Sequence, residues 1–145
     1  MASIGFLIAF LVFSMTSPAL GKFDLTFYVS CKEQHTNWCA NILVYEEDTH
    51  TAHDFLAEKK ICAPANDKTA NMTLDFGEIN PDGDNSPTYE LMFLISHNCS
   101  ATGETYCAKP PKALDTPAWR KSTIKIALGL SIENDTKGEC ARPEF

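Results

Sequence analysis

The chain has 145 residues, and its 19 acidic and 12 basic side chains give a formal net charge of -7. Because an acidic protein repels phosphate backbones, we expect no nucleic-acid partner. The length suits one small domain with a single core, so no second domain is expected.

The first 21 residues predict a secretory signal peptide. Residues 4–13 are an almost unbroken apolar run, too short to span a bilayer, and the small-residue sequence Ala19-Leu20-Gly21 ends the segment. We therefore expect cleavage after Gly21, a mature domain of residues 22–145, and secretion to the extracellular space. No later stretch approaches the ~20 apolar residues of a membrane helix, so no transmembrane segment is expected.

The mature chain is patterned as short strands. Apolar and polar residues alternate from Phe23 to Cys31, the period of a half-buried strand. Residues 41–46 are a second β-rich run, and the polar loop before them predicts a hairpin with the first strand. Residues 49–60 could form a short helix, but the flanking pattern favours a loop leading into a third strand. Alternation returns at residues 71–76, which predicts a fourth strand.

The second half of the chain continues the pattern. After the turn-rich residues 80–87, the apolar run of residues 89–96 is too continuous for a one-sided strand and is expected at the centre of a sheet. Residues 100–117 show no clear period, residues 123–132 alternate strictly, and residues beyond 133 have the composition of a polar tail. Strands of this spacing predict an all-β fold, an antiparallel two-sheet β-sandwich.

Six cysteines lie in the mature part, which predicts disulfides in an oxidising compartment. They are Cys31, Cys39, Cys62, Cys99, Cys107 and Cys140. If neighbouring strands alternate in direction, the first, third and fifth strands end at one pole, and all of these cysteines except Cys140 gather there. Several pairings are then possible. Such a locked pole could present a rigid binding surface, or the bridges could merely stabilise long loops.

Three Asn-x-Ser/Thr sequences predict N-glycosylation at Asn71, Asn98 and Asn134. Asn98 is the weakest candidate because the adjacent Cys99 is expected in a bridge, and the alternative for each is an unmodified surface Asn. The four histidines fit no zinc signature, and with the thiols oxidised we expect neither a metal nor a cofactor.

A basic stretch surrounds Trp119 and is interrupted only by Asp115. Its members are Lys109, Lys112, Arg120, Lys121 and Lys125. The stretch could meet anionic lipid headgroups or an acidic partner; the alternative is a solvated loop with Trp119 packed against the sandwich.

Residues 44–49, 53–60 and 94–99 resemble the nematode transthyretin-like family of secreted proteins. In that family a strand ending in Cys precedes an acidic segment, and a later strand ends in His-x-Cys. Cys31 and Cys99 match these two cysteines, and residues 128–132 resemble the family's final strand. The resemblance implies a disulfide-stapled transthyretin-like (prealbumin-like) sandwich, in which Cys31 with Cys99 is the preferred core bridge.

The resemblance also implies a function. It suggests an extracellular recognition protein without catalytic activity that binds cell-surface lipid, a protein or a host factor. The alternative is a carrier of small apolar ligands at an oligomer interface. Hydroxyisourate hydrolase shares the transthyretin fold, but its relatives end in Tyr-Arg-Gly-Ser, whereas residues 141–145 here are Ala-Arg-Pro-Glu-Phe. A hydrolase is therefore the least favoured reading, and fold by itself does not transfer activity.

Overall fold

The computed structural model describes residues 22–33, 37–48, 51–78, 87–117 and 122–145. The predicted signal peptide, and Trp119, Arg120 and Lys121 of the basic stretch, lie outside these residues. Within the part of the chain that the structure describes, no helix has the length and apolar character needed to cross a membrane.

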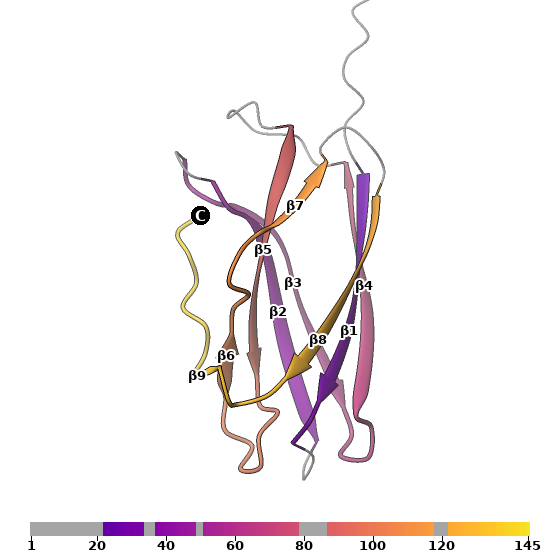
Figure 1. Ribbon diagram of the computed structural model, residues 1–145, viewed down its shortest axis with the longest axis vertical. Coiled ribbons are helices and arrows are strands. Elements are labelled where there is room, and N and C mark those ends of the chain that lie inside the picture. The colour runs from indigo at the N-terminus through magenta and orange to yellow at the C-terminus, as the bar shows by residue number, and fades with distance from the viewer. Residues whose placement is uncertain (1–21, 34–36, 49–50, 79–86, 118–121) are drawn as a thin grey trace, which may run out of the picture.

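The described residues form nine strands in two sheets that face each other (Figure 1). In chain order they are β1 (Lys22–Cys31), β2 (Trp38–Glu46), β3 (Asp54–Ala63), β4 (Thr69–Glu78), β5 (Thr88–His97), β6 (Tyr106–Ala108), β7 (Leu114–Pro117), β8 (Ser122–Leu130) and β9 (Thr136–Lys137). The smaller sheet has the order β4-β1-β8. The larger has the order β3-β2-β5-β6-β9, and β7 also pairs with β5. This is the disulfide-stapled all-β sandwich that the alternating pattern predicts.

The core lies between the two sheets. Leu25, Phe27 and Val29 point inward from β1 and are fully buried, as alternation in a one-sided strand requires. The rings of Phe27 and Phe93 meet edge to face across the layers, with centroids 5.4 Å apart. Burying each large side chain of this kind contributes about 1.5–3 kcal/mol, so the core provides most of the stabilisation.

The predicted hairpin between the first two strands is wrong. β1 pairs with β4 and β8, whereas β2 pairs with β3 and β5, so the two strands belong to opposite sheets. The connection of residues 32–37 is long enough to cross the ~10 Å between packed sheets. Both arrangements bury the apolar face of β1 equally well, so local sequence does not distinguish them.

The sandwich is also not wholly antiparallel. β8 pairs with β1 in parallel, from Phe23 opposite Ser122 to Cys31 opposite Leu130. Parallel neighbours need a long crossover connection, and here that connection passes through every strand of the larger sheet except β9.

Three further expectations concern individual segments. Residues 54–63 form β3, so the helical alternative for residues 49–60 is wrong there. The expected central position of the apolar run is confirmed, because β5 lies between β2 and the β6 and β7 segments. The polar-tail interpretation is wrong, because β9 pairs with β6 and the residues after it return to the larger sheet.

All six cysteines are paired, as Cys31–Cys99, Cys39–Cys62 and Cys107–Cys140. The bridges lie toward the end of the sandwich at which β1, β3 and β5 finish, the lower end in Figure 1. Of the three, only Cys31–Cys99 joins the two sheets, since it links the last residue of β1 to the segment after β5.

Removing this bridge should cost the most stability. We expect the Cys31→Ala/Cys99→Ala double variant to lose about 4 kcal/mol of unfolding free energy, since the bridge closes a 68-residue separation. The Cys39→Ala/Cys62→Ala variant should lose less, because that separation is 23 residues and lies within one sheet. Urea unfolding followed by tryptophan fluorescence measures both, and the reverse order of stabilities would contradict this account.

Candidate functional site

The outer face of the larger sheet is covered by the C-terminal part of the chain. Leu43, Tyr45, Met92 and Leu94 point outward from β2 and β5, yet they are buried and form a second apolar cluster. Cys140 packs against this cluster. Figure 1 shows the C-terminal segment, in yellow, running along this side of the sheet. β2 and β5 are therefore buried on both faces, which explains the continuous apolar run of β5.

We call residues 138–145 the strap. Gly138 starts it with φ of 111°, a conformation that favours glycine, and its amide donates to the carbonyl of Thr105 at 2.8 Å. The disulfide to Cys107 then fixes Cys140, whose amide donates to Ser96 Oγ at 3.0 Å. The first half of the strap is thus held covalently and by backbone hydrogen bonds.

Beyond Cys140 the strap is held by an ion pair and by ring contacts. Arg142 Nη2 donates to Glu58 Oε1 on β3 at 2.6 Å. The ring of Phe145 lies against Tyr45 and Phe55, with centroids 6.1 and 5.6 Å apart. Phe145 is itself 48% exposed. Because exposed ion pairs typically contribute less than about 1 kcal/mol, this second half is held weakly.

A hollow of about 430 Å³ lies between the strap and the outer face of the larger sheet. Leu43 and Leu94 form its apolar patch, and Cys39 and Cys140 bring two disulfides to its wall. Its hydrogen-bonding groups come from Asn41, Ser96, Asn98 and Thr105, and its charges from Glu58, Lys60, Glu139 and Arg142. We refer to this site as the hollow; it offers charges of both signs, amides and a small apolar surface on a disulfide-braced frame.

Glu58 is the best-defined charge of the hollow. Asn41 Nδ2 donates to Glu58 Oε1 at 2.6 Å, and Arg142 approaches the same carboxylate from the strap. The hydrogen bond from Asn41, and then the hydrogen bond and charge of Arg142, hold the pKa of Glu58 below its ordinary value. The carboxylate therefore stays ionised under mildly acidic conditions and keeps its contact with the strap.

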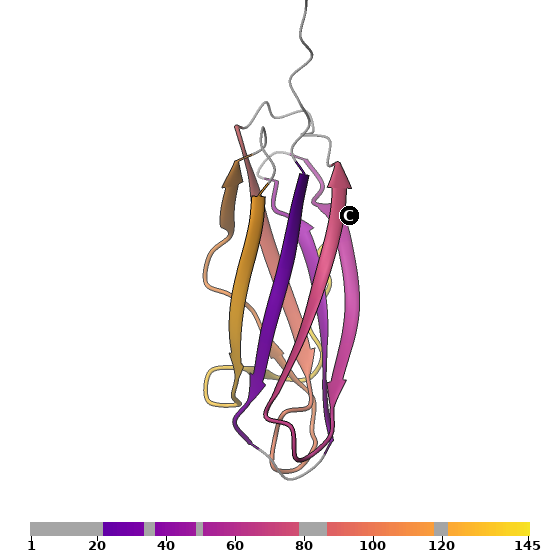
Figure 2. The ribbon, with the colours of Figure 1, turned by 90° about the vertical axis from the view of Figure 1, so that its right-hand side faces the viewer.

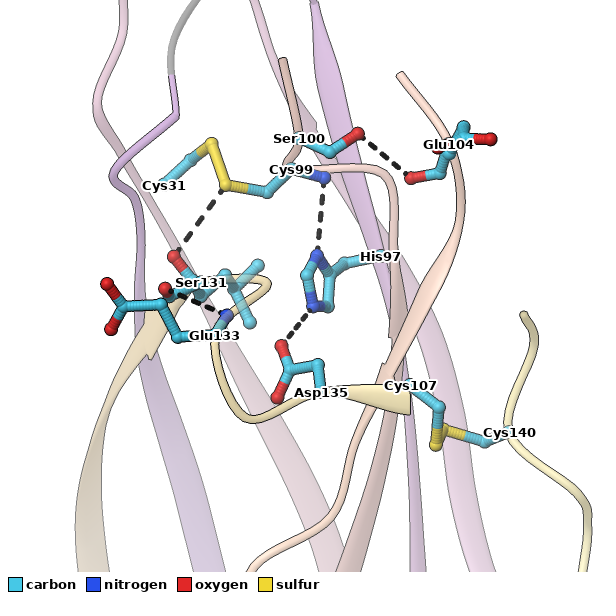
Figure 3. A network of polar contacts seen from close by, with 11 residues as sticks. Cys31, His97, Cys99, Ser100, Glu104, Cys107, Ser131, Glu133, Asp135 and Cys140 are labelled. Atoms are coloured by element: carbon cyan, nitrogen blue, oxygen red, sulfur yellow. Dashed lines mark hydrogen bonds and ion pairs between the residues drawn. A yellow bond between two sulfur atoms is a disulfide. The ribbon is translucent and has the colours of Figure 1, made fainter. Parts of the chain in front are cut away.

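A buried His–Asp pair connects the strand ends near the hollow (Figure 3). His97 Nε2 lies 2.7 Å from Asp135 Oδ2, and the His97 side chain is 0% exposed. The other ring nitrogen, Nδ1, accepts the amide hydrogen of Cys99 at 3.2 Å. This acceptor role puts the ring proton on Nε2, which donates it to Asp135. Both nitrogens are engaged in holding the β5 end to the turn after β8.

The structure separates the predicted glycosylation sites. Asn71 is exposed on β4, and Asn134 is exposed in the turn before β9. Asn98 is only partly exposed, its Oδ1 accepts the Cys39 amide at 2.6 Å, and it adjoins the buried Cys99. These surroundings favour modification of Asn71 and Asn134 over Asn98.

The described lysines of the basic stretch lie on different sheets. Lys109 and Lys112 lie between β6 and β7 of the larger sheet, whereas Lys125 lies on β8 of the smaller one. Of the groups that line the hollow, Cys39 and Cys140 were predicted as disulfide residues and Asn98 as a glycosylation site, whereas the charged groups such as Glu58 were not predicted as site residues. The one available signal was a cysteine within the supposed tail, Cys140, since its bridge had to return the tail to the body of the domain.

The His97–Asp135 pair predicts a stability effect at Asp135. In the Asp135→Ala variant the buried Nε2–H of His97 loses its acceptor, so the unfolding free energy should fall by about 1–3 kcal/mol. Glu133→Ala, in the same turn, is the matched control, because the Glu133 amide rather than its exposed side chain makes the local contact with Ser131. Urea unfolding of both variants tests this, and equal stabilities would contradict the structural role of the pair.

The contacts of Glu58 predict its titration. We expect a pKa below the ordinary 4.5, and both Asn41→Ala and Arg142→Gln should raise it, because the Asn41 hydrogen bond and the hydrogen bond and charge of Arg142 stabilise the ionised carboxylate. Since the folded-state pKa is lowered, the stabilisation by ionised Glu58 is present above pH 4.5 and is lost as pH falls through the folded-state value. Carboxyl-detected NMR titration measures these values, and an unchanged titration in Asn41→Ala would refute the assignment.

Comparison with known proteins identifies a family. No curated protein and no solved structure matches the chain. A family model described as "Caenorhabditis elegans protein of unknown function (DUF870)" matches residues 26–143, which include all six cysteines and most of the strap. The chain therefore belongs to this nematode protein family.

Proposed function

We propose that the protein is a secreted recognition protein without catalytic activity, which binds a segment of an extracellular polypeptide in the hollow. The observation that carries the proposal is the frame of the hollow, where the Cys39–Cys62 and Cys107–Cys140 bridges brace opposite walls. A braced site loses little conformational entropy when a ligand binds, which favours affinity.

The lining supports a polypeptide ligand in particular. Asn41 and Asn98 each use one amide atom within the protein, and the second atom of each amide matches a hydrogen-bonding group of a peptide backbone. Lys60 and Glu139 supply charges of opposite sign. Leu43 and Leu94 add only a small apolar surface to the hollow, because both side chains are nearly buried. A carrier of small apolar ligands is less well supported, because such sites are lined mainly by apolar and aromatic groups.

Two features favour binding over catalysis. Nδ1 of His97, the nitrogen that would have to act as a base, accepts a backbone hydrogen bond instead. All six cysteines are in disulfides, so the chain carries no thiolate nucleophile. The full pairing of the cysteines also supports an oxidising, extracellular location.

We further propose that the sandwich is a divergent member of the transthyretin-like group. The support is the Cys31–Cys99 bridge, which connects a strand ending in Cys with the later strand that ends in His97-Asn98-Cys99. The strap and the Cys107–Cys140 bridge are additions to that pattern.

A charge reversal in the hollow tests the binding proposal. Immobilised, oxidised residues 22–145 would be exposed to extracellular nematode protein, and the captured protein identified and its affinity measured. Lys60→Glu should weaken that affinity roughly tenfold, since a charge that faced the ligand now has the opposite sign. Lys125→Glu, on the outer face of the smaller sheet, is the matched control. Loss of binding in Lys125→Glu but not in Lys60→Glu would place the site elsewhere.

A further inference from the structure

Among the residues whose exposure the structure describes, the outer face of the smaller sheet carries one exposed aromatic ring. Figure 2 shows this sheet toward the viewer, with β1 between β8 and β4. Tyr28 of β1 is 45% exposed there. The other large hydrophobic side chains that are exposed in the described residues are Phe55 and Phe145, and they contact each other at the end of the strap. Tyr28 lies apart from that contact, because it is on the opposite sheet.

A predicted glycosylation site lies directly beside this ring. Tyr28 is opposite Asn71 in the antiparallel pairing of β1 with β4, so both side chains are on the same face of the sheet. Opposed residues of this kind have Cβ atoms about 4.5–5.5 Å apart. Thr73, which completes the Asn71-Met72-Thr73 sequence, is exposed on the same face. A sugar attached to Asn71 would thus begin within reach of the Tyr28 ring.

The sheet is hollowed around this pair. A groove of about 330 Å³ runs past Tyr28 and Asn71, and small side chains make its floor. Ala127 is opposite Tyr28 on β8, and Gly129 is opposite Ser30 in the next row. A Cβ atom at Gly129 would lie 3.8 Å from Ser30 Oγ, in ordinary contact, so the lack of a side chain there deepens the groove. Ser30 and Thr69 add hydroxyl groups to the wall.

This chemistry suits a pyranose ring. A sugar such as N-acetylglucosamine has a face of C–H groups that packs on an aromatic ring, and its hydroxyl and acetamido groups require hydrogen-bonding partners. The groove supplies one aromatic ring, small side chains and hydroxyls in that arrangement. Covalent attachment at Asn71 would also give the sugar a high effective concentration at the groove.

We propose that the first sugars of an N-linked glycan on Asn71 pack against Tyr28 and occupy this groove, so that the glycan forms an ordered part of the surface. The proposal requires that Asn71 is modified during secretion; it does not depend on the ligand of the hollow, which lies on the opposite sheet.

A thermodynamic cycle tests the contact. The protein would be secreted from eukaryotic cells as the Asn134→Gln variant, so that the Asn71 glycan can be studied by itself, and trimmed to one N-acetylglucosamine. Unfolding by urea would then be compared with and without Asn71→Gln, in the Tyr28 and Tyr28→Ser backgrounds. We expect the sugar to raise the folding equilibrium constant roughly threefold with Tyr28 and to have no effect with Tyr28→Ser. Because Tyr28 is exposed, Tyr28→Ser should still fold.

The Asn134 glycan is the matched control. In the Asn71→Gln variant, any effect of the Asn134 sugar should be the same with Tyr28 and with Tyr28→Ser. Equal effects of the Asn71 sugar in both backgrounds would overturn the proposal. A peptide mass spectrum in which Asn71 of the secreted protein is unmodified would also overturn it. So would sedimentation that shows a dimer of the glycosylated protein which dissociates when Tyr28→Ser is introduced, because Tyr28 would then contact a second copy rather than the sugar.

Discussion

The Cys31–Cys99 disulfide is the covalent link between the two sheets, and much of the architecture is arranged around it. Its sulfurs lie at the ends of β1 and β5, the central strands that carry the inward-facing Phe27 and Phe93. Hydrogen bonds next to the bridge connect further segments at the same end of the sandwich. The Cys99 amide orients His97, and His97 holds Asp135 in the turn after β8. This closed end adds a covalent constraint to the relative position of the two layers, which the packing of the core between them also holds.

The same end of the sandwich determines where the strap lies. Once Asp135 is anchored, β9 can pair with β6, Gly138 can redirect the chain, and Cys140 can reach Cys107. The strap then buries the outward face of β2 and β5 and creates the hollow beside it. The hollow therefore depends on tertiary closure at several points, and we propose recognition there because a frame closed in this way loses little conformational entropy on binding.

The buried His–Asp pair illustrates how the same residue types can serve structure rather than reaction. A catalytic imidazole needs one nitrogen free to exchange a proton with a substrate, whereas both nitrogens of His97 are in hydrogen bonds, one with the Cys99 amide and one with Asp135.

The two outer faces of the sandwich differ in the side chains that they carry. The larger sheet carries the strap and a charged hollow, and the smaller sheet carries hydroxyls, small residues and Tyr28.

The alternation of residues 23–31 and 123–132 was sufficient to predict strands with one buried face, because side chains of a strand point alternately to its two sides. The continuity of residues 89–96 likewise indicated a strand covered on both faces. Those patterns depend only on near neighbours in the chain. Which strand lies beside which was decided by tertiary structure. The apolar face of β1 could be buried equally well if β1 paired with β2 in one sheet or if the two strands lay in opposite sheets. Only the complete sandwich determines that they lie in opposite sheets. The parallel pairing of β8 with β1, the return of Cys140 to Cys107 and the meeting of Asn41, Glu58 and Arg142 all join residues distant in sequence, and no local period encodes such contacts.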